Sequence, residues 1–319
     1  IWVTMTPVEG MTWTYSYLTG KNSEKSDIDI FGATIWDNPY LNHSEIEKLT
    51  SSYSEEELQI RLYGKYVNLS GHCVFSKKAL SAYMERTATP KFTGFIHEDR
   101  HGKLTWEENK NGFFRIWRAP NPKDRLEQYV VGADVAEGTE GGDFSCAEVL
   151  CRHRCEVVCE LHANCDTDLF AGEIIKLHRF YNGAKLAVEK NSHGISVINY
   201  IRDRVPRHKL YCRRQYDKHG HYEGDAIGWE TNKRTKPILV DAVAQFIREQ
   251  AVVIHGEELV RELNTFIRRK DGSVGSQGSC HDDRVISLGI GLICFQETYE
   301  MTQHRVNADS YTRGVHTGY

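Results

Sequence analysis

Four carboxylates stand at the ends of apolar runs, where a folded chain rarely carries charge. Asp134 ends the run VVGAD, Glu189 ends LAVE, and the pair Asp282 and Asp283 precedes RVISLGIGL. Charged groups at the ends of core elements are uncommon unless they are paired or bound to metal. Several carboxylates gathered at one sheet edge also repel one another unless cations neutralise them. The joint pattern therefore predicts a metal site.

Oxygen-only ligands suit Mg²⁺ or Mn²⁺, and two such ions about 4 Å apart can hydrolyse a phosphodiester. Each acid taken alone has a structural explanation: Asp282 as a helix cap, Glu189 as a surface ion-pair partner, Asp134 as a turn former. Asp143, after Gly142, is either an outer metal ligand or a turn residue. We therefore rest the prediction on the set and not on any single acid.

The elements that position these acids follow from hydrophobic periodicity. We expect strands over 129–135, 144–151, 156–163, 185–188 and 210–213, and helices over 168–181, 194–202, 237–250 and 282–296. Three strands, a helix, and then alternating strands and helices predict an α/β domain with a mixed sheet flanked by helices.

The segment before this domain has a different character. Residues 119–122, with two prolines in three positions, are the best candidate for a linker. We therefore divide the chain of 319 residues into 1–36, 37–122 and 123–319.

The opening lacks an initiator Met and starts inside an apolar run, so we expect a fragment. No run of 18 apolar residues is present, and no membrane partner is expected.

The formal net charge of -4 does not by itself suggest nucleic-acid binding. An acidic metal site and a basic track cancel in such a sum, however. Local basic positions lie at the end of the expected strand at 210–213 and before the helix at 237–250. We predict phosphate contacts for Arg213, Arg214, Lys233, Arg234 and Lys236.

Cys151, Cys155 and Cys159 are spaced by four, which indicates reduced thiols and not a zinc site.

Three runs of sequence resemble the nuclease motifs of the large terminase subunit of tailed bacteriophages. They are ADVAEGTEGGDFSCAEV, AVEKNSHGISVI and HDDRVISLGIGL. The resemblance implies an RNase H-like nuclease in which Asp134, Glu189 and Asp283 are catalytic, with Asp282 close by as a further candidate ligand. The residues after Glu189, namely Lys190, Asn191 and His193, are candidates for positioning phosphate or water, with a core or loop role as the alternative.

Upstream, TIWDNPYLNHSEIEKL and VTMTP are similar to the connector and the ATPase segment of that family. The resemblance thus implies an ATPase remnant over 1–36, a connector over 37–122 and a nuclease domain over 123–319. The chain contains no GxxxxGK[ST] loop, so no ATP hydrolysis is expected from it. The implied partners are double-stranded DNA, the small terminase subunit and the portal protein, in the host cytoplasm and transiently at the procapsid portal.

Two alternative functions remain open at this point. One is another RNase H-like nuclease of the resolvase or transposase type. The other is a DNA-clamping or portal-docking module whose acids are structural. Dependence of DNA cleavage on Mn²⁺ or Mg²⁺ separates the second alternative from the nucleases.

Overall fold

The computed structural model divides into two compact units, and each is considered by itself. The larger unit contains Lys78–Val260 and Asp283–Tyr319, and the smaller unit contains Ile1–Lys77 and Arg261–Asp282. The structure describes residues 5–6, 31–38, 40–42, 46, 55–65, 73–121, 128–138, 144–216, 219, 221–269, 271–277 and 280–297. Most of the segment 1–36 therefore lies outside the described residues.

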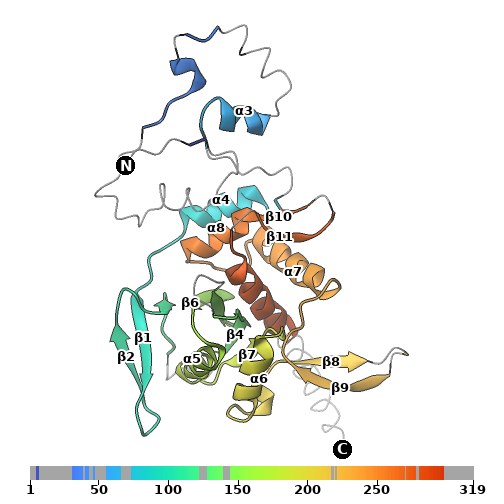
Figure 1. Cartoon of the computed structure of the whole chain (residues 1–319). Coiled ribbons are helices and arrows are strands. Elements are labelled where there is room, and N and C mark those ends of the chain that lie inside the picture. Colours follow the sequence, from blue (N-terminus) through green and yellow to red (C-terminus); the bar gives the residue numbers. More distant parts are fainter. Residues whose placement is uncertain are drawn as a thin grey trace, which may run out of the picture. The chain divides into compact units, whose positions relative to one another are not determined.

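A seven-stranded sheet is the main sheet of the larger unit (Figure 1). Its strands lie in the order β2-β1-β3-β6-β5-β4-β7. Neighbouring strands are antiparallel except β4 and β7, which are parallel. The strands are β1 (Phe92–Glu98), β2 (Leu104–Glu108), β3 (Phe114–Ile116), β4 (Tyr129–Asp134), β5 (Ser145–Cys151), β6 (Glu156–Ala163) and β7 (Lys185–Val188).

The part of the sheet from β6 to β7 has an RNase H-like topology. Strands β4, β5 and β6 form an antiparallel meander, and β7 returns parallel to β4 after helix α5 (Thr167–Phe180). After helix α6 (Gly194–Arg202), a parallel bridge joins Leu210 to Leu186 of β7. Three antiparallel strands followed by two parallel segments confirm the predicted fold class.

Strands β1, β2 and β3 extend this sheet beyond β6. They come from residues that the sequence analysis assigned to the connector over 37–122. Phe114 and Ile116 of β3 pair with β6 and are almost fully buried. The sheet therefore continues across the boundary expected at residue 122, because β3 finds its hydrogen-bonding partner on the far side of the proline-rich segment.

Helices α5 and α6 cover one face of the sheet. Phe170, Ile174 and Leu177 of α5 recur at the three-to-four-residue spacing of a helix face and are buried. Ala133 of β4 and Val188 of β7 point into the same core. Because side chains alternate along a strand, the neighbours of these two residues face the opposite side.

The helix over residues 283–297 lies against that opposite face. A Cβ atom at Gly132 of β4 would come within 2.1 Å of the Ser287 carbonyl oxygen and 2.3 Å of the Gly291 nitrogen. Only glycine permits two backbones to approach so closely. Leu239 of helix α7 (Thr235–Glu249) packs against Gly289 of the same helix. The 283–297 helix is thus held between the sheet and α7.

Strands β8 (Cys212–Tyr216) and β9 (Tyr222–Ile227) form a separate hairpin that projects from the larger unit (Figure 1). The prediction of one strand over 210–213 was wrong in extent. Leu210 joins the main sheet through its bridge to Leu186, whereas Cys212 already pairs with Ile227 of β9. One short segment therefore serves two different sheets.

The remaining elements are η2 (Ile35–Asp37), α3 (Glu55–Arg61), α4 (Lys77–Glu85), η3 (Arg207–Lys209), α8 (Glu257–Thr265), β10 (Phe266–Arg268) and β11 (Val274–Ser276). In the smaller unit, the Val74 N–H donates a 3.1 Å hydrogen bond to the Phe266 carbonyl, and the Phe75 and Phe266 rings lie 5.5 Å apart. In the described part of the chain, every helix is too short or too polar to span a membrane.

Replacing Gly132 by alanine tests the close approach of helix and strand. The atoms that a new Cβ would meet are backbone atoms, which cannot rotate away, so G132A should lose about 3 kcal/mol of unfolding free energy. Gly172 of α5 is the matched control, since nothing lies within 4 Å of its added Cβ. G172A should gain about 0.5 kcal/mol. Urea denaturation of both variants checks this, and equal stabilities would contradict it.

Candidate active site

Asp134 and Glu189 stand side by side at the ends of two parallel strands. β4 and β7 pair with Ala133 opposite Val188, and the Glu189 N–H donates a 2.8 Å hydrogen bond to the Ala133 carbonyl. Since Ala133 and Val188 point into the core under α5 and α6, the two acids that follow them point to the other face. The 283–297 helix covers that face. Glu189 is only 7% exposed.

Asp283 opens the helix on this face. Gly291 of the helix packs against Leu150 of β5, and the Ser287 hydroxyl lies 3.4 Å from the Cys146 sulfur at the other end of β5. Cys146 is the register partner of Asp134. The start of the helix is therefore at the end of β4 that carries Asp134.

Residues four apart share one side of a helix, so Asp283 lies on the same side as Ser287 and one turn nearer the helix start. Asp283 is buried, with 9% of its surface exposed. Together, the ends of β4 and β7 and the start of the helix bring Asp134, Glu189 and Asp283 to one end of the same face.

The other two predicted acids are placed differently. Asp282 belongs to the smaller unit, where its carboxylate oxygen lies 3.5 Å from the position of an added Cβ at Gly275 of β11. It is half-buried, whereas its neighbour Asp283 is buried. Asp143 lies outside the described residues. The two neighbouring aspartates, which the sequence could not separate, thus have different surroundings.

Asn191 holds the Glu189 carboxylate in place. Its side-chain amide donates hydrogen bonds to Glu189 Oε2 at 2.6 Å and to the Val135 carbonyl at 2.9 Å. Its Oδ1 accepts the Gly194 N–H at 2.6 Å, at the start of α6. Asn191 was predicted either to position phosphate or water or to have a core or loop role, and its contact with Glu189 was not predicted. The available signal was an asparagine three residues before a helix start, which favours such backbone bonds.

The same face carries buried charges that the sequence analysis did not select. Glu160 of β6 is 1% exposed and accepts hydrogen bonds from Arg284 and Arg115. Burial by itself would raise the pKa of Glu160, but the two arginines outweigh it and hold that pKa below its ordinary value. Burial raises the pKa of the Cys146 thiol, and the charges of Glu148 and Glu160 raise it further. Cys146 is thus a protonated thiol and not a nucleophile.

The donor chemistry of the three acids fits a hard cation. Asp134, Glu189 and Asp283 offer carboxylate oxygens, which Mg²⁺ and Mn²⁺ prefer. Within the described ranges, no three His, Cys, Asp or Glu side chains are grouped closely enough to hold a metal ion. Carboxylates without a cation between them repel one another.

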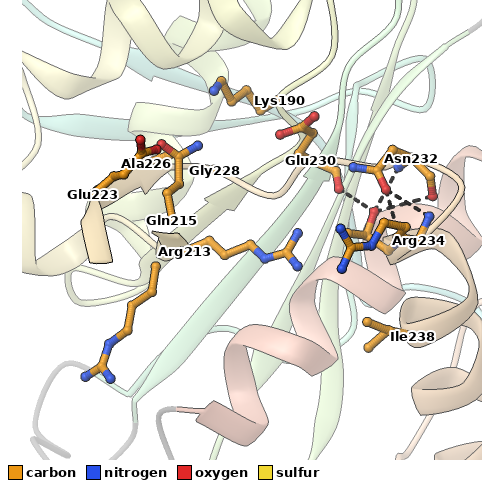
Figure 2. Close-up of a pocket in the computed structure, with 12 residues that line it drawn as sticks. Lys190, Arg213, Gln215, Glu223, Ala226, Gly228, Glu230, Asn232, Arg234 and Ile238 are labelled. Atoms are coloured by element: carbon orange, nitrogen blue, oxygen red, sulfur yellow. Dashed lines mark hydrogen bonds between the residues drawn. The ribbon is translucent and has the colours of Figure 1, made fainter. Parts of the chain in front are cut away.

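A pocket of about 640 Å³ begins at Lys190, the residue after Glu189 (Figure 2). Its lining includes four basic side chains, two acids and three neutral polar groups: Lys190, Arg213, Arg214, Arg234, Glu223, Glu230, Gln215, Asn232 and Thr235. Figure 2 shows the Arg213 guanidinium directed from β8 toward Asn232 and Arg234, just before α7. The pocket thus collects basic groups from β8, from the segment just after β7 and from the residue that precedes α7.

Arg213 is held near the end of β7. Its guanidinium carbon lies 5.3 Å from the centre of the Trp229 ring. The backbone N–H of Trp229 donates a 2.9 Å hydrogen bond to the Val188 carbonyl, and the Trp229 carbonyl accepts one of 2.5 Å from the backbone N–H of Lys190. Of the five residues predicted to contact phosphate, Arg213, Arg214 and Arg234 line this pocket, whereas Lys233 and Lys236 are not among its lining residues.

Removing the Asn191 side chain tests its role as the support of Glu189. N191A leaves the buried Glu189 carboxylate and the Val135 carbonyl without these donors, so we expect a loss of about 2 kcal/mol of unfolding free energy. N232A is the control, because exposed Asn232 accepts backbone N–H groups at the start of α7 without touching an acid. It should cost about 1 kcal/mol. A smaller loss in N191A than in N232A, measured by urea denaturation, would contradict the assignment.

No family model matches the chain, and no curated protein matches its sequence. Among solved structures, the chain is similar to the large terminase nuclease of thermophilic phage G20c, with 17% identity, a TM-score of 0.45, and coverage of 69% of this chain and 97% of that one. The magnesium-bound form of that nuclease matches at 15% identity and a TM-score of 0.47. It covers 70% of this chain and 97% of that one. The large terminase nuclease domain of Thermus phage P74-26 matches at 15% identity and a TM-score of 0.43, over 66% of this chain and 93% of that domain.

Proposed function

We propose that this chain is a terminase-type nuclease, a metal-dependent endonuclease that cuts double-stranded viral DNA during genome packaging. The observation that carries the proposal is the common face of Asp134, Glu189 and Asp283 at the ends of β4, β7 and the start of the 283–297 helix. The same acids stand in the three sequence runs that resemble terminase nuclease motifs.

Two Mg²⁺ or Mn²⁺ ions at such carboxylates activate a water molecule and stabilise the leaving oxygen of a phosphodiester. Asp134 at the end of β4, Glu189, oriented by Asn191, and Asp283 at the helix start are the residues that would hold the ions. Asp282 and Asp143 are the further ligand candidates that the sequence runs supply.

The basic pocket would hold the DNA backbone next to these acids. Lys190, Arg213, Arg214 and Arg234 are among its lining residues, and Lys190 follows Glu189 directly. Basic side chains at phosphates fix the register of DNA without reading its sequence. We therefore expect weak sequence preference, with Lys233 and Lys236 as two further phosphate contacts.

The proposal extends to the partners that the sequence resemblance implies. These are the small terminase subunit and the portal protein, met in the host cytoplasm and transiently at the procapsid portal, without a membrane partner. The nucleotide-binding loop GxxxxGK[ST] is absent from the sequence, so the chain by itself should not hydrolyse ATP.

Plasmid cleavage tests the metal-dependent mechanism. The protein should nick and linearise plasmid DNA with Mn²⁺ and stop with EDTA, and D134N should lose cleavage because an amide lacks the charge that holds both ions. D134N should also melt at the same or a higher temperature without metal, since one of several neighbouring carboxylates is neutralised. The control is D203N, at an exposed aspartate whose side chain is 71% accessible, which should cut normally.

A structural aspartate at 134 gives the opposite pair of results, with a lower melting temperature and retained cleavage. Cleavage that continues unchanged in EDTA would overturn the metal mechanism itself. D283N and D282N extend the same assay, with D283N inactive and D282N impaired. Normal cutting by both would mean that the third acid lies elsewhere.

Salt dependence of DNA binding tests the pocket. Each phosphate contact that is lost lowers the log–log slope of affinity against salt by about 0.9. The double variant R213A/R234A should therefore bind plasmid DNA more weakly, with a slope smaller by about two. The control is R100A/K110A, which removes two exposed charges at the turns flanking β2 and should keep the slope. Equal slopes for the two double variants would remove the pocket from the DNA path.

A further inference from the structure

A buried ion pair joins the 283–297 helix to the middle of the sheet. Arg284 donates from Nε to Glu160 Oε2 at 2.8 Å and from Nη2 to Oε1 at 3.4 Å. The side chains of Arg284 and Glu160 are 8% and 1% exposed. Arg115 of β3 contacts the same carboxylate from the sheet. The pair therefore links two elements that are 124 residues apart in the chain.

Arg284 is the residue directly after Asp283. Neighbouring helix residues point in different directions, so the anchored arginine and the acid belong to different sides of one turn. The second attachment of this turn is Ser287, whose hydroxyl lies 3.4 Å from the Cys146 sulfur and 3.0 Å from the Arg284 carbonyl. The first turn of the helix is thus fixed at two points, one and four residues after Asp283.

Stability alone is a poor explanation for this ion pair. Taking two charges out of water costs more than the pair returns unless its geometry is very good, and apolar side chains often fill such a place equally well. Here Glu160 also faces Glu148 across the β5–β6 pair, and both carboxylates are 1% exposed. On this sheet face with two buried acids, Arg115 pairs with Glu160 from the sheet, and Arg284 is the cation that the helix supplies to the same carboxylate.

We propose that Arg284, anchored on Glu160, is a positioning residue. It holds the helix start so that the Asp283 carboxylate lies level with the Asp134 carboxylate along the direction of β4. The inference rests on the proposed nuclease function, and it adds a residue that does not itself contact metal or DNA. Partners of metal ligands that fix their orientation typically change metal affinity or activity 10–100-fold when they are removed.

The test compares R284K with R115K. Lysine keeps the charge but cannot make the two-bond contact of a guanidinium. Both arginines bind Glu160, but only Arg284 is attached to the helix of Asp283. We measure the Mn²⁺ dissociation constant by calorimetry, the Mn²⁺ concentration for half-maximal plasmid cleavage, and the metal-free melting temperature. R284K should bind Mn²⁺ about 10–100-fold more weakly, whereas R115K should lower the melting temperature and leave Mn²⁺ affinity within about twofold of wild type.

Equal Mn²⁺ affinities in R284K and R115K would overturn the inference and leave the ion pair as a purely structural contact. If R284K does not fold, E160Q/R284M replaces it, because a neutral pair leaves neither member of the buried Arg284–Glu160 contact as an uncompensated charge, and Arg115, whose side chain is 32% exposed, can turn to water. Weakened Mn²⁺ binding in that folded double variant supports positioning, and wild-type binding overturns it. Failure of the proposed function is a separate result, since the wild-type protein would then neither bind Mn²⁺ nor cut.

Discussion

The backbone contact between β4 and the 283–297 helix is the constraint on which the acidic face depends. The backbones of Ser287 and Gly291 lie so close to Gly132 that a Cβ atom at position 132 would have no room. Helix and strand therefore meet at one defined place, and this backbone contact determines which helix turn lies beside the end of β4. The pairing of β4 with β7 sets the position of Glu189 in the same way. Three acids that lie far apart in the chain thus share a framework of main-chain contacts.

The two faces of the seven-stranded sheet differ in how much buried charge they carry. The face under α5 and α6 is apolar, whereas the opposite face contains Glu148, Glu160 and Arg284 at under one-tenth exposure. Buried charge lowers stability unless it is paired and hydrogen bonded, and proteins depart from an apolar core mainly where function requires it. The asymmetry between the two faces therefore supports a chemical role for the charged one, independently of any motif.

The sequence predicted the elements whose signal is local. Strands β6 and β7 and helix α6 agree with the predicted ranges because long apolar runs or a helical period define them. The β8–β9 hairpin was incompletely predicted because its polar residues carry no alternation, and β1–β3 were assigned elsewhere because pairing with β6 is a long-range event. Asn191 and Arg284 were underestimated for the same reason. Their importance comes from partners, Glu189 and Glu160, that only the folded chain brings within reach.

The step from Glu189 to Lys190 joins the two halves of the proposed site. Successive side chains of an extended segment point to opposite sides, so the acid faces the helix that carries Asp283 while the lysine lines the basic pocket. Trp229 fixes both halves at this step: its backbone bonds to Val188 and Lys190, and its ring lies against Arg213. The acids and the basic pocket therefore lie on two sides of one strand end, joined by the main chain from Glu189 to Lys190 without any flexible linker. The net charge of -4 conceals this arrangement, because it sums an acidic face and a basic pocket that the fold keeps on opposite sides of one strand end.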